Sequence, residues 1–103
     1  MNRIHISEDT RVKVAFSRAE LASIEEHAFI GRELEERLRE VAPERGKQVA
    51  QLTLYEIEHL LEAVIAEANH TADAKLKSQF DALHQRLLAR LEAYDDGNWQ
   101  HPA

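Results

Sequence analysis

Two Glu-x-x-His pairs are the arrangement in this chain that comes closest to a known chemical site. The first pair joins Glu56 to His59, and the second joins Glu67 to His70. This spacing places both side chains on one helical face, as in carboxylate-bridged di-iron bundles. Both pairs fall on a single predicted helix, however, and lie roughly 16 Å apart along its axis, which is too far to share a metal. Their side chains also project from the polar face, so we expect solvated polar residues and no metal site.

The other residue types with catalytic potential also lack the patterns that catalysis requires. The chain has no cysteine, which excludes disulfides, thiolate ligands and cysteine nucleophiles. Its glycines stand alone at Gly31, Gly46 and Gly97, so no phosphate-binding loop or dinucleotide-binding fingerprint can form. No serine lies in a nucleophile elbow. We therefore predict a protein that is not an enzyme, with no catalytic, cofactor-binding or metal-binding residue and no cofactor.

Charge and composition narrow the choice of partner and compartment. The 103 residues include 19 acidic and 13 basic side chains, for a net charge of −6. A polyanion would be repelled on average, so nucleic acid is an unfavourable partner. The absence of cysteine favours a reducing compartment, and no apolar run approaches the roughly 18 residues of a spanning helix. We expect a cytoplasmic protein that makes no contact with a membrane.

Two capping boxes mark the starts of two helices. Ser17 is followed three residues later by Glu20, and Thr53 is followed in the same way by Glu56. In such a box the hydroxyl accepts a bond from the third helical amide, and the carboxylate accepts one from the amide of the cap residue. The helix that opens at Thr53 has the broadest apolar face in the chain. That face consists of Leu54, Ile57, Leu60, Leu61, Val64, Ile65 and Ala68.

Two more helices follow from turn residues and apolar spacing. One should run from Gly31 to the turn that begins at Pro43. The last should follow a tight turn in which Asn69 closes one helix and Thr71 caps the next. Its narrow apolar seam suits either the intramolecular core or an interface between packed helices. The seam consists of Leu76, Phe80, Leu83, Leu87, Leu91 and Tyr94.

Short strands are predicted where apolar and polar residues alternate. Residues 12–16 alternate in this way, and Val49 to Leu52 forms a second candidate. Ile4 and Ile6 either pair with the first strand through a hairpin turn at residues 7–10 or form a frayed start. If the two main strands pair, helix packing must supply most of the stability, because a two-stranded ribbon is marginal alone.

A shift of 36 residues superimposes the pattern of the first half on the second. Phe16-Ser17 then falls on Leu52-Thr53, Glu20 on Glu56, Leu21 on Ile57, and Ile24 on Leu60. This is either a βαα internal duplication or the repeated use of a common strand, cap and helix order. We therefore predict a mainly α protein of the α+β class, with four amphipathic helices and two or three short strands. Residues 1–96 should form one domain, and residues 97–103 a flexible tail.

The last helix and the tail carry the candidate interface residues. Lys75, Arg86 and Arg90 form a basic stripe that could meet an acidic helix or a phosphate backbone, or could pair with the chain's own carboxylates. Leu88 lies off the apolar seam, and Trp99 lies in the tail. These two are our candidates for an exposed homodimer contact.

Part of the second half resembles a known group of modules. The sequence LTLYEIEHLL at residues 52–61 is followed by AEANHT at 66–71 and KL at 75–76. Together these resemble the small helical modules that accompany plasmid pRiA4b ORF-3-like proteins. The resemblance covers roughly residues 45–94, and the Ala-Asn-His-Thr turn is its most distinctive piece. It implies a bacterial, intracellular accessory domain and transfers no catalytic or binding residue.

These observations favour a protein-interaction module that self-associates or docks on another protein through its helices. The alternative is a nucleic-acid-associated regulatory protein that uses the basic stripe of the last helix. In that case binding should weaken steeply with salt.

Overall fold

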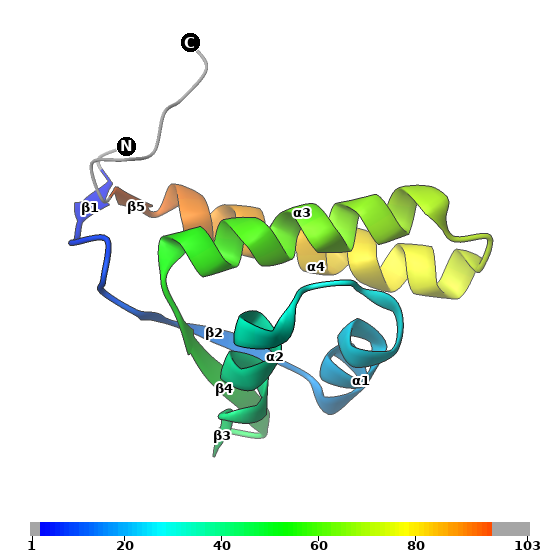
Figure 1. Ribbon diagram of the computed structural model, residues 1–103, viewed down its shortest axis with the longest axis horizontal. Coiled ribbons are helices and arrows are strands. Elements are labelled where there is room, and N and C mark those ends of the chain that lie inside the picture. The colour runs from blue at the N-terminus through cyan, green and yellow to red at the C-terminus, as the bar shows by residue number, and fades with distance from the viewer. Residues whose placement is uncertain (1–2, 96–103) are drawn as a thin grey trace, which may run out of the picture.

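The computed structural model describes residues 3–95, which form four helices and five short strands. The elements are β1 Ile4–His5, β2 Val12–Phe16, α1 Arg18–His27, α2 Arg32–Arg39, β3 Ala42–Glu44, β4 Lys47–Leu52, α3 Leu54–His70, α4 Ala74–Glu92 and β5 Tyr94–Asp95. In Figure 1 the long α3–α4 hairpin lies above a lower part that contains β2, β3 and β4 together with α1 and α2. The predicted α+β class with four helices is confirmed, whereas the prediction of two or three short strands is wrong, because the described residues form five. The tail predicted at residues 97–103 lies outside the described part of the chain.

The helix starts follow the predicted caps in two cases and differ from the prediction in one. Ser17 and Thr53 both form complete capping boxes, as their sequences predict. The prediction that Thr71 caps α4 is wrong, because the Asp73 carboxylate accepts bonds from the first amides of that helix. The Thr71 hydroxyl instead accepts a bond from the Asp73 amide at 3.1 Å. Asn69 lies within α3, so it does not close that helix.

A three-stranded sheet with the order β2-β4-β3 forms the centre of the lower part. The predicted pairing of the two main strands is confirmed as antiparallel, with Val14 opposite Ala50. The prediction that Pro43 lies in a turn is wrong, because it lies in β3, which forms a hairpin with β4. Proline is tolerated there because β3 is an edge strand. The turn falls at Arg45 and Gly46, both of which have positive φ, as tight hairpin turns require.

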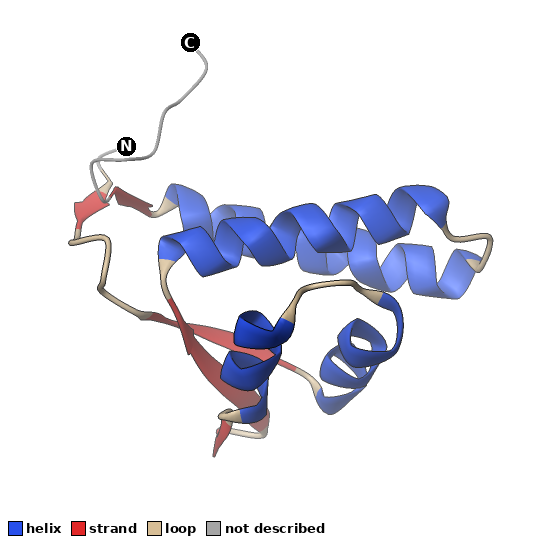
Figure 2. Cartoon of the chain, viewed as in Figure 1, coloured by secondary structure: helices blue, strands red, loops and turns tan. Residues whose placement is uncertain are grey.

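Strand β1 does not pair with β2. The N-terminal hairpin, one of the two alternatives predicted for residues 4–16, is therefore wrong. Strand β1 pairs instead with β5, in parallel, beside the C-terminal end of α4, as Figure 2 shows. The Ile4 amide donates to the Ala93 carbonyl at 3.0 Å, and the Ile6 amide donates to the Asp95 carbonyl at 2.9 Å. At β2, arginine side chains of α4 donate hydrogen bonds to the Lys13 and Ala15 carbonyl oxygens.

The core lies between the α3–α4 hairpin and the sheet with its two shorter helices. The apolar seam of α4 belongs to this core and not to an open interface. Its buried members are Leu76, Phe80, Leu83, Leu87 and Leu91, and they pack with buried residues of β2, β4 and α3. Helices α3 and α4 each contribute five of the buried apolar residues, so their packing contributes strongly to the hydrophobic stabilisation.

The internal duplication is not confirmed by the structure. The order of strand, capped helix and second helix occurs twice, and Val14 and Ala50, which are 36 residues apart, are register partners. The helices differ in length, however, because α1 and α2 have 10 and 8 residues and α3 and α4 have 17 and 19. Strand β3 also has no counterpart in the first half. A common strand, cap and helix order explains the same observations.

Candidate interaction site

Arg86, a member of the predicted basic stripe, binds groups of its own chain. Its guanidinium donates to both carboxylate oxygens of Glu20, and one of these contacts measures 3.3 Å. It also donates to the Ala15 carbonyl of β2 at 2.7 Å. A planar guanidinium with five N–H donors is well suited to bridge a carboxylate and a strand edge in this way. Arg86 therefore joins α4 to β2 and α1.

Arg90 makes a similar contact one turn further along α4. It donates to the Lys13 carbonyl at 2.9 Å and to the Tyr94 hydroxyl at 3.2 Å, and its guanidinium carbon lies 5.3 Å from the centre of the Tyr94 ring. Lys75 is exposed at the start of α4, 11 residues and roughly 16 Å from Arg86. The three predicted interface cations therefore do not form one free basic surface.

The Glu20 carboxyl is the only titratable group of the described residues with a resolved pKa shift. Burial alone would raise its pKa. The hydrogen bond and the charge of Arg86, together with the bond from the Ser17 amide, outweigh that effect, so the pKa lies below its ordinary value. Since the ion pair is explained by packing, it indicates a structural role and not a catalytic one.

Of the two predicted apolar contact residues, the structure describes only Leu88. Leu88 is half-buried on α4. Trp99 lies outside the described residues. The large apolar side chains exposed within residues 3–95 are Ile4, Phe29 and Tyr55 instead.

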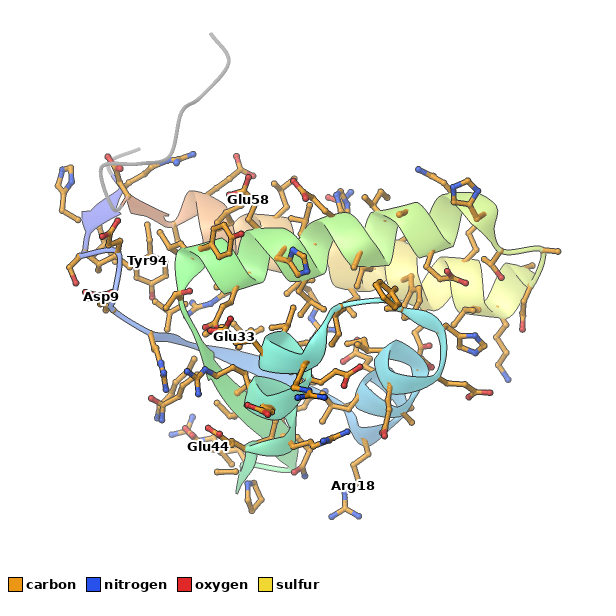
Figure 3. All side chains as sticks on the ribbon, in the orientation of Figure 1. Asp9, Arg18, Glu33, Glu44, Glu58 and Tyr94 are labelled. Carbon is orange, nitrogen blue, oxygen red and sulfur yellow. The ribbon has the colours of Figure 1, made fainter. Side chains whose placement is uncertain are left out.

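A half-open groove of about 520 Å³ lies between the loop before β2, the start of α2 and the first turns of α3. Its volume is within the range of known ligand and peptide pockets. Figure 3 labels Glu33, which lies below the first turns of α3, and Asp9, which lies on the loop between β1 and β2. Both residues line this groove, so three segments that are distant in the sequence build one surface.

The charges in the groove divide into a paired and an unpaired set. Arg37 lies 3.3 Å from the Glu56 carboxylate, and the Glu56 carboxylate also accepts a bond from the Thr53 amide. In the unpaired set, no side chain makes a hydrogen bond or ion pair among residues 3–95. This set consists of Arg11, Arg32, Asp9 and Glu33. Unlike the arginines of α4, these four charges remain available to another molecule.

Two exposed aromatic side chains belong to segments that line the groove: Tyr55 is itself a lining residue, and Phe29 directly precedes the lining residue Ile30. Phe29 is 95% exposed in the segment between α1 and α2, and Tyr55 is 75% exposed on the first turn of α3. The His59 ring, one turn after Tyr55, forms a 3.1 Å hydrogen bond between its Nε2 and the Ile30 carbonyl. This bond fixes the segment that carries Phe29 against α3. The two aromatic residues therefore belong to two segments that this hydrogen bond joins.

Sequence reasoning did not single out this surface. Tyr55 falls outside the apolar arc of α3, and Phe29 lies in a short connection without periodicity. The one sequence signal is that Phe29 stands two residues before Gly31, where the next helix is predicted to start, and apolar side chains in surface connections are hard to bury. Its pairing with residues of α3 depends on the tertiary fold.

The Glu-x-x-His residues have structural partners or lie apart. Glu56 completes a capping box and pairs with Arg37, and His59 binds the Ile30 carbonyl. Within residues 3–95, no three histidine, cysteine or acidic side chains are grouped closely enough to hold a metal ion. None of the helices described combines the length and apolar character needed to cross a membrane.

Comparison with protein-family models, with curated proteins and with solved structures finds no match to this chain. The resemblance to the modules that accompany pRiA4b ORF-3-like proteins therefore stays a prediction.

Proposed function

We propose that this protein is a non-enzymatic interaction module, and that it binds a protein through the groove and the two aromatic residues beside it. The observation that carries the proposal is the 95% exposure of Phe29 on a segment that a hydrogen bond holds in place. Burying a phenylalanine side chain contributes about 1.5–3 kcal/mol, and this gain is unused in the single chain. Aromatic residues are also the usual anchors of protein interfaces.

The surroundings of Phe29 support a protein partner over a small molecule. Tyr55 adds a second aromatic side chain, and the unpaired charges line the groove beside it. An apolar anchor within a polar rim is the common anatomy of a protein interface. A cytoplasmic setting and an accessory role beside another bacterial protein belong to this proposal.

The nucleic-acid alternative receives no support from the fold. Two of its three basic residues, Arg86 and Arg90, bind carbonyl oxygens of β2, so their charges are committed within the chain. Phosphate binding by these arginines would have to break those bonds. Without these two arginines the stripe retains one cation, Lys75. A single cation neutralises too few phosphates for the electrostatic affinity that such binding requires.

Site-specific photo-crosslinking in growing cells tests the proposed surface. Benzoylphenylalanine would replace Phe29 in one variant and Tyr55 in another, within the full chain. The matched control places the same group at Gln85, an exposed position on α4. We expect discrete protein adducts from positions 29 and 55, identified by mass spectrometry, and none from position 85. Illumination that yields no discrete adduct at either position, or the same adducts at all three, would contradict the proposal.

A further inference from the structure

The unpaired charges of the groove are balanced, and this balance limits what can bind there. Arg11 and Arg32 provide two cations, and Asp9 and Glu33 provide two anions. The whole chain, by contrast, has a net charge of −6. An acidic peptide would be drawn to the arginines but repelled by the two carboxylates, and a basic peptide would meet the opposite conflict. A partner that presents two cations and two anions satisfies all four groups.

A second copy of the same chain presents that set of charges. In a contact with two-fold symmetry, the same patch is used on both subunits, so each residue type must find its complement within the patch itself. The groove provides a cation for every anion. The groove also has a volume of about 520 Å³, and its lining residue Ile30 directly follows Phe29, which is 95% exposed. An exposed aromatic side chain and a groove thus occur within one residue of each other along the chain.

Electrostatics between whole molecules point to the same face. Two chains of charge −6 repel each other on average, so self-association requires a surface where the local charge is neutral. The groove meets this condition because its paired arginine, Arg37, is already neutralised by Glu56, and its unpaired charges cancel.

We infer that the partner on this face is a second copy of the chain, with Phe29 of each copy entering the groove of the other. Arg11 and Arg32 of one copy then face Asp9 and Glu33 of its partner. The inference rests on the proposed function, because it names the molecule that covers the same surface.

The experiment uses two charge variants of the full chain. The acidic variant carries Arg11→Glu and Arg32→Glu, and the basic variant carries Asp9→Lys and Glu33→Lys. Sedimentation velocity over a concentration series would give the oligomeric state of the wild type, of each variant and of a 1:1 mixture. We expect a dimer for the wild type, monomers for each variant alone and a restored dimer in the mixture.

The basic variant separates a local effect from the overall charge. It is four charge units more positive than the wild type, so its net charge lies closer to zero. If overall repulsion alone controlled association, this variant would dimerise more tightly than the wild type. A monomeric basic variant therefore supports the local contact, and a tighter dimer overturns it.

Phe29→Ser tests the apolar part of the contact. We expect dimer affinity to fall by about 10- to 100-fold, as for an anchor residue, with an unchanged melting temperature measured below the dimer concentration range. The control Gln85→Ser should leave affinity unchanged.

A wild type that stays monomeric while position 29 cross-links to a different protein overturns the inference and leaves the proposed function intact. Without a dimer and without cross-links, both fail. A dimer that the mixture does not restore also overturns the inference.

Discussion

Two arginine-bearing regions of this molecule differ in how their charges are satisfied. At the contact between α4 and β2, Arg86 and Arg90 bind a carboxylate, two backbone carbonyls and an aromatic ring. At the groove, Arg11 and Arg32 have no partner among the described residues. The role of a cationic side chain in this fold therefore depends on the acceptors that lie within its reach. A stripe of basic residues in the sequence therefore does not by itself indicate a binding surface.

The difference has a structural cause in the edge of β2. An edge strand leaves backbone carbonyls without a ladder partner, and these groups need donors. Because α4 lies along this edge, its arginines fill that need at Lys13 and Ala15 and close the strand to pairing with another chain. The groove lies at the ends of several elements, where no carbonyl or carboxylate reaches Arg11 or Arg32.

The largest effect that separates the two regions should come from Arg86→Ala. We expect the free energy of unfolding to fall by about 2–3 kcal/mol, because the substitution leaves the Glu20 carboxylate buried without its cation and frees the Ala15 carbonyl. Urea denaturation followed by circular dichroism measures this loss as a lower midpoint. Gln85→Ala on the same helix is the control and should change stability by less than about 0.5 kcal/mol. Equal effects of the two substitutions would show that Arg86 is not a structural residue.

A smaller loss, about 1–2 kcal/mol at neutral pH, should follow from Glu20→Gln. Glutamine can still accept the Ser17 amide in the capping box, so only the charge interaction with Arg86 is lost. Because the folded-state pKa of Glu20 lies below the ordinary value of 4.5, the ionised carboxylate stabilises the fold above that pH. This contribution disappears as the pH falls through the folded-state pKa.

Denaturation of wild type and Glu20→Gln at a series of pH values checks this direction. The difference in unfolding free energy should be constant near neutral pH and shrink on acidification. A difference that grows as the pH falls would mean that burial dominates and raises the pKa.

The local part of the fold could be predicted from the sequence, because its signals are local. The Ser17 and Thr53 capping boxes each lie within four residues and are found as predicted. The apolar spacing of α3 and α4 fixes which faces are buried, since a regular helix repeats its faces regardless of the rest of the chain. The cap of α4 failed because Thr71 and Asp73 are both good capping residues, and the choice between them depends on where α3 ends.

The non-local contacts could not be predicted, because no spacing rule relates their partners. Ile4 pairs with Tyr94, 90 residues away, and Glu20 pairs with Arg86, 66 residues away. The groove combines the loop before β2 with the starts of α2 and α3. Residue types indicate which groups need partners, but only the packed chain shows which of them, such as Arg32, remain without one.

A weaker contact at the α4 region should respond less, and Arg90→Met tests it. Methionine keeps an unbranched apolar stem but removes the bonds to the Lys13 carbonyl and the Tyr94 hydroxyl. We expect a loss of about 1 kcal/mol, less than for Arg86, because Arg90 does not pair with a buried carboxylate and its Nε atom has no acceptor. Thermal or urea denaturation measures the change. A loss larger than that of Arg86→Ala would reverse the order of the two arginines.

The smallest effect on stability should come from the groove, where Arg11→Ala and Arg32→Ala remove unpaired charges. Each should change the free energy of unfolding by less than about 0.5 kcal/mol, since surface residues without partners contribute little. The measurement is urea denaturation at a protein concentration below the range in which dimers form, because association would add its own stabilisation to the wild type. A loss above about 1 kcal/mol in either variant would show that the arginine has an intramolecular partner. The contrast with α4 would then fail, and the groove would lose the free charges on which a contact with a second copy depends.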